Sequence, residues 1–353
     1  MGVTPTSAAG FYQMFQDKND LTWSGSDQFT SYKANGFQYW LFGDTILGTE
    51  NAAGGYDGGW TMIGNSILLQ QGDLLVPALA SGSSLAVPDP ATRDSSNLER
   101  YWTQGMFAAN GFVYVLAQRV RNTSSGFEIV GGELAKFSQD ATTGKLTFKS
   151  MIVLPSTGQP EVPGPKGIQW CSDAVVSAGG YVYIFGATRA EGNPYVIHFS
   201  YVMRVPTASV ENVSAWRFYK ASTGTWVDKI DQLDQDVVNQ PDAIFASQAS
   251  SVRWINSKWV EIDKPWNGWG VDVKIRTAST PMGPWTEATL FQSPEGTFEG
   301  LPYETYAPQL HPEFPLGSGK VLVSIARNFK NGDLPTIGSN ADLYKAEFYE
   351  FTI

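Results

Sequence analysis

Short segments of alternating or fully apolar residues recur along the chain, and five of them begin alike. They start at Gly36 (GFQYWLFGD), Gly111 (GFVYVLAQR), Gly180 (GYVYIFGAT), Ser257 (SKWVEIDKP) and Gly319 (GKVLVSIAR). Each begins at a turn and continues into a run that is typical of a β-strand. The starts are 75, 69, 77 and 62 residues apart. This spacing predicts that one β unit is repeated five times.

Each unit also has a strand-like segment before its turn and further segments after it. The preceding segments are SDQFTSYKAN, YWTQGMFAAN, IQWCSDAVVSAG, ASQASSVRWIN and YETYAPQLHPEF. About four antiparallel strands in each of five units predict an all-β fold, a single five-bladed β-propeller over residues 1–353. We expect the C-terminal strand AEFYEFTI to close the ring by completing a blade begun near the N-terminus. The alternative is a pair of β-sandwiches, although no Pro- or Gly-rich linker divides the chain into halves.

The first unit brings two acidic residues together. Asn35-Gly36 separates two runs rich in aromatic and β-branched residues and favours a two-residue type I′ turn. In that hairpin, residues whose numbers sum to 71 face each other, so Asp27 lies opposite Asp44. Like charges that face each other destabilise a sheet unless one is protonated, a cation lies between them or the strands splay. Glycoside hydrolysis requires such a carboxylate pair. The alternative is that Asp27 caps a turn and Asp44 ends a strand, both facing water.

The predicted fold also locates further candidates. In a propeller, the first strand of each blade lines a central channel, and loops at one end form a pocket. Aromatic faces there stack on sugar rings, and polar groups bind hydroxyls. On or beside these strands lie Asp27, Trp102, Gln104, Trp170, Asp173, Gln248, Glu304 and Tyr306. Core packing between blades explains Trp102 and Trp170 equally well, and Glu304 is the best third acidic candidate.

Composition limits the function further. A net charge of −10 disfavours binding to nucleic-acid phosphates and is compatible with a neutral polysaccharide. Cys171 is alone, and no Cys/His spacing predicts a metal site, so we expect neither a metal nor a cofactor. We expect His198 in a packed strand and His311, which precedes a proline, in a turn. The glycine-rich residues 52–60 lack the lysine of a phosphate loop and predict a mobile loop beside the site.

No apolar run of 18 residues and no signal peptide is visible. We therefore expect no membrane segment. The location that we expect is extracellular or phage-borne, with action on the cell wall.

Several motifs resemble glycoside hydrolase family 183. They are W-x-G-x-D-x-x-x-S at residues 23–31, WLFGDT at 40–45, IFG at 184–186, GPW at 283–285, and residues 306–312 with Val323-Ser324. The resemblance implies a five-bladed propeller with endo-D-arabinanase activity, which cleaves α-linked D-arabinofuranose chains such as those of mycobacterial arabinogalactan and lipoarabinomannan. It also implies that Asp27 and Asp44 are the catalytic pair. The family usually has a glycine within two residues of the first acid. This chain has Gln28-Phe29 instead, which we expect to narrow a subsite.

The local sequence suggests a role for each acid. Asp44 follows an apolar run that raises its pKa and suits the general acid, whereas Asp27 has polar neighbours and suits the base. The reverse assignment stays open. We expect a monomer that inverts the anomeric centre. Two other functions also stay open: a non-catalytic sugar-binding propeller of the phage-receptor type, and a five-bladed glycosidase acting on another furanoside such as L-arabinan or fructan.

Overall fold

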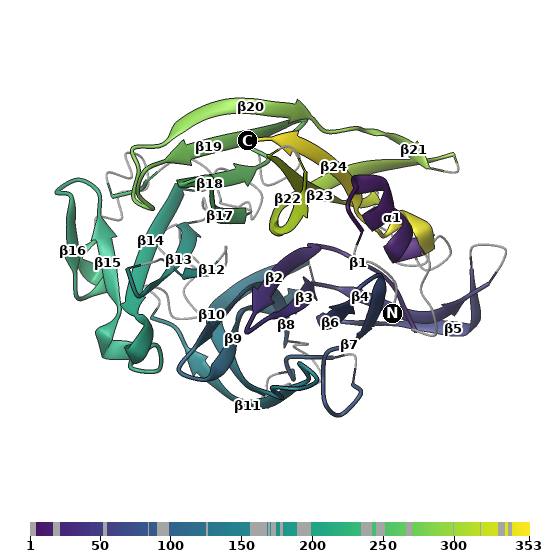
Figure 1. Ribbon diagram of the computed structural model, residues 1–353, viewed down its shortest axis with the longest axis horizontal. Coiled ribbons are helices and arrows are strands. Elements are labelled where there is room, and N and C mark those ends of the chain that lie inside the picture. The colour runs from purple at the N-terminus through teal and green to yellow at the C-terminus, as the bar shows by residue number, and fades with distance from the viewer. Residues whose placement is uncertain are drawn as a thin grey trace.

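In the computed structural model of the chain, each of the five predicted turn-strand units lies in its own sheet and forms the second strand of a hairpin there (Figure 1). These strands are β3 (Phe37–Phe42), β9 (Phe112–Thr123), β13 (Tyr181–Thr188), β18 (Lys258–Asp263) and β23 (Lys320–Phe329). The structure describes residues 5–16, 22–51, 55–83, 85–89, 99–124, 126–155, 168, 170, 174–176, 179–188, 199–233, 242–244, 251–265, 270–298, 300–317, 319–330, 336–337 and 341–353. In these residues the fold is all-β apart from short helical segments.

Every second strand pairs antiparallel with the strand that precedes its turn. Those preceding strands are β2 (Thr30–Ala34), β8 (Glu99–Ala109), β12 (Ala174–Val176), β17 (Ser251–Ile255) and β22 (Leu301–Leu316). On the other side of its second strand, each sheet continues with further strands. In chain order these are β6 (Ser66–Gln71) and β7 (Leu74–Pro77) in the first sheet; β10 (Gly126–Gln139) and β11 (Leu146–Val153) in the second; β14 (Phe199–Pro206), β15 (Arg217–Lys220) and β16 (Thr225–Val227) in the third; β19 (Asp272–Ala278) and β20 (Thr286–Gln292) in the fourth; and β24 (Glu347–Thr352) in the fifth. The short strand β21 (Gly296–Phe298) pairs with β22.

The first strands of these sheets lie at a common centre. β2 contacts β8, β8 contacts β12, β12 contacts β17, β17 contacts β22, and β22 contacts β2. The five sheets therefore follow one another in a closed cycle, in the order of the sequence (Figure 1).

A hydrophobic cluster fills the space between each two successive sheets. Adjacent residues of one second strand point to opposite faces and so pack against different sheets, which explains why these strands are mostly apolar. Representative pairs are Leu41 with Val115, Leu116 with Ile184, Phe185 with Val252, Val260 with Val323, and Leu322 with Trp40.

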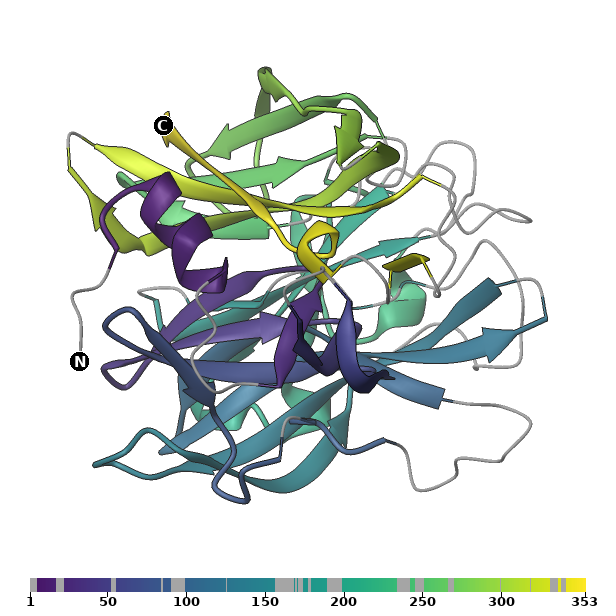
Figure 2. The ribbon, with the colours of Figure 1, turned by 90° about the vertical axis from the view of Figure 1, so that its right-hand side faces the viewer.

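The expected closure of the ring by the C-terminal strand is wrong. β24 pairs with β23 and so completes a sheet made of the last strands of the chain. The N-terminal residues instead form the helix α1 (Ala8–Gln16), which lies beside β24 (Figure 2). Phe15 of α1 stacks on Phe348 of β24, with ring centroids 5.6 Å apart. An amphipathic helix therefore covers this sheet where a shared strand was expected.

A further sheet of three strands contains the residues around the acidic pair. It consists of β1 (Trp23–Ser26), β4 (Thr45–Glu50) and β5 (Tyr56–Ile63). The expectation of a loop at residues 52–60 is wrong for residues 56–60, which begin β5; residues 52–54 lie outside the described residues. Gly58 and Gly59 have φ values of 74° and 92° and form a bulge opposite β4, so their role is to shape a strand.

The sequence also predicts a position for each of the two histidines. His311 lies within β22 and is fully buried, so its expected position in a turn is wrong. His198 and Cys171 lie outside the described residues. The helices in the described part of the chain are all too short or too polar to cross a membrane.

Candidate active site

The predicted register of the first hairpin is confirmed on both sides of the acidic pair. β2 and β3 pair from Ala34 with Phe37 to Thr30 with Leu41, and β1 and β4 pair Gly25 with Ile46 and Ser26 with Thr45. Every one of these pairs sums to 71. Between the two ladders, the Asp27 N–H donates to the Asp44 carbonyl and the Gly43 N–H donates to the Asp27 carbonyl, both at 3.3 Å. Asp27 therefore lies opposite Asp44, as expected.

A kink separates the two halves of this hairpin. Gln28 and Phe29 have φ values of 68° and 21°, which are unfavourable for residues with a side chain. The Thr30 hydroxyl donates to the Gln28 carbonyl at 2.9 Å, and the Ser324 hydroxyl donates to the Phe29 carbonyl at 3.3 Å. The Phe29 ring is fully buried, so it does not narrow a subsite as expected. The kink sends the two halves into different sheets and leaves Asp27 at their junction.

Asp27 is partly buried and weakly solvated. Its Oδ2 accepts a hydrogen bond from the Tyr306 hydroxyl at 3.2 Å, whereas Oδ1 is buried and has no hydrogen-bond partner among the described residues. Burial and the charge of Asp44 raise the pKa of Asp27 to about 7, and hydrogen bonds from Tyr306 and Tyr344, together with Arg100, oppose this rise. A carboxyl with this pKa holds a proton at mildly acidic pH.

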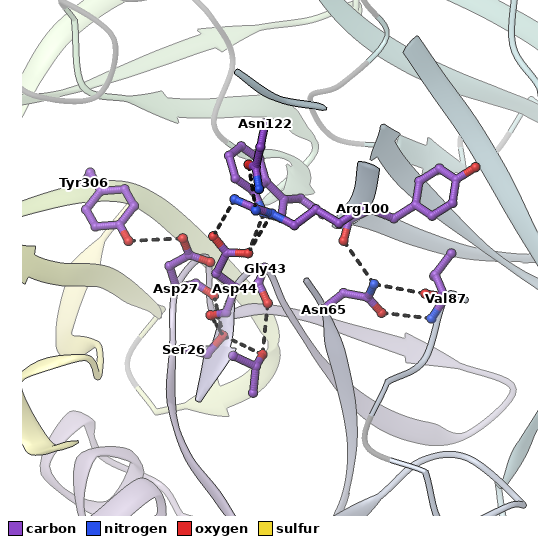
Figure 3. A network of polar contacts seen from close by, with 12 residues as sticks. Ser26, Asp27, Gly43, Asp44, Asn65, Val87, Arg100, Asn122 and Tyr306 are labelled. Carbon is purple, nitrogen blue, oxygen red and sulfur yellow. Dashed lines mark hydrogen bonds and ion pairs between the residues drawn. The ribbon is translucent and has the colours of Figure 1, made fainter. Parts of the chain in front are cut away.

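Asp44 has more donors around it. Arg100 Nη2 donates to Oδ2 at 3.2 Å, Arg100 Nε lies 3.1 Å from Oδ1, and Trp102 Nε1 donates to Oδ1 at 2.8 Å. Burial raises the pKa of Asp44, while Arg100 and the Trp102 hydrogen bond oppose the rise. The side chain is still 15% exposed. Figure 3 shows the two carboxylates side by side, with Tyr306 on one flank and Arg100 on the other.

Sequence reasoning missed Arg100, which is two residues before Trp102 on β8 and shares its face of the strand. Its Nη1 donates to Asn122 Oδ1 at 2.8 Å, and its guanidinium lies over the Trp102 ring, 5.3 Å from the centroid. Gly64 leaves room for it, because a Cβ there would lie 2.9 Å from Arg100 Cβ. The one feature of the sequence that could have identified Arg100 is its position two residues before the candidate residue Trp102.

The structure brings some of the other predicted residues to this site. Trp102 and Gln104 are partly exposed on β8, and Gln104 donates to Gln118 Oε1 at 3.2 Å. Tyr306 extends from β22 to Asp27. Both strands contact β2, which follows the kink.

One other predicted residue lies elsewhere, and three stay predictions. Trp170 is 1% exposed and packs against Phe218 in the core between two sheets, so it does not present a face to a sugar. Glu304 is two residues before Tyr306, and its pKa is raised by burial among the charges of Lys330, Glu295 and Lys264. Asp173 and Gln248 lie outside the described residues. Within the described ranges, no group of three or more His, Cys, Asp or Glu residues is placed to hold a metal ion.

The sequence profile of a family described as a domain of unknown function (DUF5005) matches residues 10–352. The chain belongs to this family. The resemblance to glycoside hydrolase family 183 rests on the motifs and stays a prediction. The comparison with curated proteins gives no match for this DUF5005 chain.

Among solved structures, the fold is similar to that of a presumed hydrolase from Bacteroides ovatus. The TM-score is 0.72 at 18% identity, and the match covers 97% of this chain and 88% of that one. A family GH43_1 enzyme from Xanthomonas citri has a TM-score of 0.48 at 11% identity, covering 96% and 92%. A family 43 arabinoxylan arabinofuranohydrolase from Bacillus subtilis has a TM-score of 0.48 at 12% identity, covering 95% and 65%. The likeness to the Bacteroides ovatus protein concerns the fold alone.

Proposed function

We propose that this protein is an endo-acting glycoside hydrolase that cleaves α-linked D-arabinofuranosyl chains, with Asp27 and Asp44 as its acid/base pair. The observation that carries the proposal is the facing position of the two carboxylates at a kinked hairpin, both partly accessible and with unequal partners. Two carboxyl groups whose surroundings separate their proton affinities are the requirement of acid/base glycoside hydrolysis. D-arabinan as the substrate rests on the resemblance to glycoside hydrolase family 183.

In this proposal the five sheets are the blades of a single propeller. The closed cycle of contacts between their first strands supports this arrangement, as do the apolar clusters between successive sheets. The site then lies where the first, second and fifth blades meet, at Asp27, β8 and β22. Trp102 offers an aromatic face for a sugar ring, and Gln104 offers hydrogen bonds to hydroxyls.

The reaction needs no cofactor. The protonated carboxyl donates its proton to the glycosidic oxygen, and the bond between C1 and that oxygen breaks with its electron pair moving to the oxygen. The other carboxylate takes a proton from a water molecule, whose oxygen forms the new bond to C1 from the opposite face. Inverting enzymes need about 6.5–9.5 Å between the carboxyls to hold this water. The backbones of Asp27 and Asp44 are hydrogen-bonded to each other, so the two side chains must diverge to reach this separation. We propose inversion.

Incubation with three polysaccharides tests the function. Mycobacterial arabinogalactan should yield D-arabinan oligosaccharides of mixed length, whereas plant L-arabinan and a fructan should stay intact. Asp27→Asn and Asp44→Asn should each lower the rate by about 10² or more, the lower range for a positioned acid or base. Proton NMR of the first-formed anomer tests inversion.

Other outcomes would contradict the proposal in distinct ways. Cleavage of L-arabinan or fructan would place the enzyme on another furanoside, and release of monosaccharide alone would contradict the endo mode. Binding without cleavage would favour a sugar-binding propeller. We further propose that the enzyme acts as a monomer on cell-wall arabinan, outside the producing cell or on a phage particle.

A further inference from the structure

The two carboxylates of the pair differ in the number of donors that reach them. Asp44 accepts hydrogen bonds from Arg100 Nη2 on Oδ2 and from Trp102 Nε1 on Oδ1, and Arg100 Nε lies 3.1 Å from Oδ1 as an ion-pair contact. Asp27 accepts the Tyr306 hydroxyl on Oδ2 and also faces the neutral Tyr344 hydroxyl, while its buried Oδ1 has no hydrogen-bond partner in the described part of the chain. A buried oxygen without a donor is far less costly in a neutral carboxylic acid than in a charged carboxylate.

The position of Arg100 is fixed on several sides. Asn122 Oδ1 accepts a hydrogen bond from Arg100 Nη1 at 2.8 Å, and the Trp102 ring lies under the guanidinium. Gly64 has no side chain and so leaves space for the Arg100 side chain. Gly64 is followed by Asn65, whose Nδ2 donates to the Tyr101 carbonyl next to Arg100 at 3.0 Å (Figure 3). These contacts hold the Arg100 guanidinium beside both carboxylate oxygens of Asp44. An always-charged group in this position favours an ionised carboxylate.

We propose that Arg100 is a positioning residue that keeps Asp44 ionised as the base and thereby leaves Asp27 to hold the proton as the general acid. This assignment reverses the one suggested by the local sequence, and it rests on the proposed hydrolase function. In each turnover Asp27 gives its proton to the leaving oxygen and Asp44 takes one from the attacking water. A water molecule then returns the proton from Asp44 to Asp27.

The charged and titratable groups that face the pair agree with this division. Among the described residues that act on the pair, Arg100 is the one that adds positive charge, and it contacts Asp44. Tyr306 and Tyr344 face Asp27, and burial together with the nearby carboxylates raises the pKa of both phenols well above its usual range, so they remain neutral hydrogen-bonding groups.

The leaving group of the substrate distinguishes the two roles. A 2,4-dinitrophenyl glycoside of a D-arabinofuranosyl oligosaccharide needs no proton on its leaving oxygen, so it does not require the general acid. We expect Asp27→Asn to stay within about tenfold of wild type on this substrate while losing about 10² or more on D-arabinan. Asp44→Asn should lose about 10² or more on both. The opposite pattern would overturn the assignment, while a wild-type protein inactive on both substrates would overturn the proposed function itself.

A second measurement follows Arg100. In Arg100→Leu the acidic limb of the pH profile of kcat/KM should move up by about one unit or more, because an opposite charge at this distance lowers a carboxyl pKa by about 1–3 units. Arg100→Lys should restore part of that shift, and KM should change little in both. A role in folding alone would lower activity and the Tm without moving the limb. An unchanged limb in a folded Arg100→Leu protein would exclude the proposed role.

Discussion

Gly43 faces the carboxylate of Asp27 so closely that a Cβ atom at Gly43 would lie 2.3 Å from Asp27 Oδ1. Atoms at that distance overlap, so any side chain at position 43 must displace the carboxylate or the strand that carries it. The glycine of the FGD motif therefore leaves the space that the acid of the opposite strand occupies.

We expect Gly43→Ala to lower the rate on D-arabinan by about 10² or more, because a small misplacement of a catalytic group costs about that much. The fold should survive, since the carboxylate is the far end of a side chain that can move. Gly317→Ala is the matched control, because a Cβ there meets no atom within 4 Å. Initial rates and melting curves of both variants test the prediction. A fully active Gly43→Ala would mean that the position of Asp27 is irrelevant.

Local sequence was sufficient to predict the turn, the register and the strands. Asn35 and Gly36 have φ values of 49° and 90°, as a type I′ turn requires. From that turn alone the register extends to Ser26 and Thr45. The apolar runs identified the second strands because burial on both faces favours apolar residues at most of their positions.

Contacts between distant segments were not predictable in the same way. Arg100 reaches Asp44 from another sheet, and no local pattern pairs a charge on β8 with a carboxylate beside β4. Trp170 is as aromatic as Trp102, yet only the packing of neighbouring sheets decides that one is buried and the other partly exposed. His311 precedes a proline, but it lies in β22 opposite Leu322, and its ring contacts Ser31 and Ser324 from other parts of the chain.

Hydrolysis of D-arabinan should depend on pH as a bell-shaped curve whose alkaline limb lies near pH 7. The acid must be protonated, and the pKa of Asp27 is raised to about 7 by burial and by Asp44. Activity therefore falls as pH rises through about 7, whereas on the acidic side it falls when Asp44 takes up a proton. The profile of kcat/KM from pH 4 to 9 provides the measurement. An alkaline limb that persists in Asp27→Asn, on the activated substrate, would assign it to another group.

Asp27→Asn should stabilise the folded protein at pH 8. A carboxyl whose pKa rises from 3.8 to about 7 on folding contributes stability that is present below pH 3.8 and lost as pH rises through about 7. Removing this charge should raise the Tm at pH 8 by about 1–3 °C, and the gain should shrink at pH 5. Differential scanning calorimetry at both values tests this. Asp73→Asn, in an exposed turn, should leave the Tm unchanged at both, and equal gains for the two variants would refute the effect.

Substitution of Trp102 should separate its two contacts. Trp102→Phe keeps a ring but removes the Nε1–H that donates to Asp44 at 2.8 Å. We expect kcat to fall about tenfold, as for one charge-assisted hydrogen bond, with KM nearly unchanged. Trp102→Ala should also raise KM about 2- to 12-fold, which corresponds to about 0.5–1.5 kcal/mol of aromatic contact. Equal KM values for the Phe and Ala variants would show that the ring does not bind substrate.

Arg276 lies among three carboxylates that are far in sequence from Asp27 and Asp44. Its Nη1 donates to Glu261 Oε2 at 2.8 Å and to Asp263 Oδ1 at 3.0 Å, and its Nη2 lies 2.6 Å from Glu287 Oε2. Glu261 and Asp263 are fully buried. Burial raises the pKa of Glu261 well above its usual value and that of Asp263 to about 6, and Arg276 opposes both shifts.

We expect Arg276→Met to lower the free energy of unfolding by about 3–5 kcal/mol at pH 8, because two buried carboxylates lose their cation. The loss should be smaller at pH 5. Both pKa values are raised on folding, so the folded protein binds more protons than the unfolded chain in this range, and stability falls as pH rises. Lys320→Met, which removes an exposed pair with Glu350, should cost at most about 1 kcal/mol. Urea unfolding at both pH values measures these differences. A loss that is equal at pH 5 and pH 8 would contradict the explanation by charge, and would leave the packing of the Arg276 side chain as its cause.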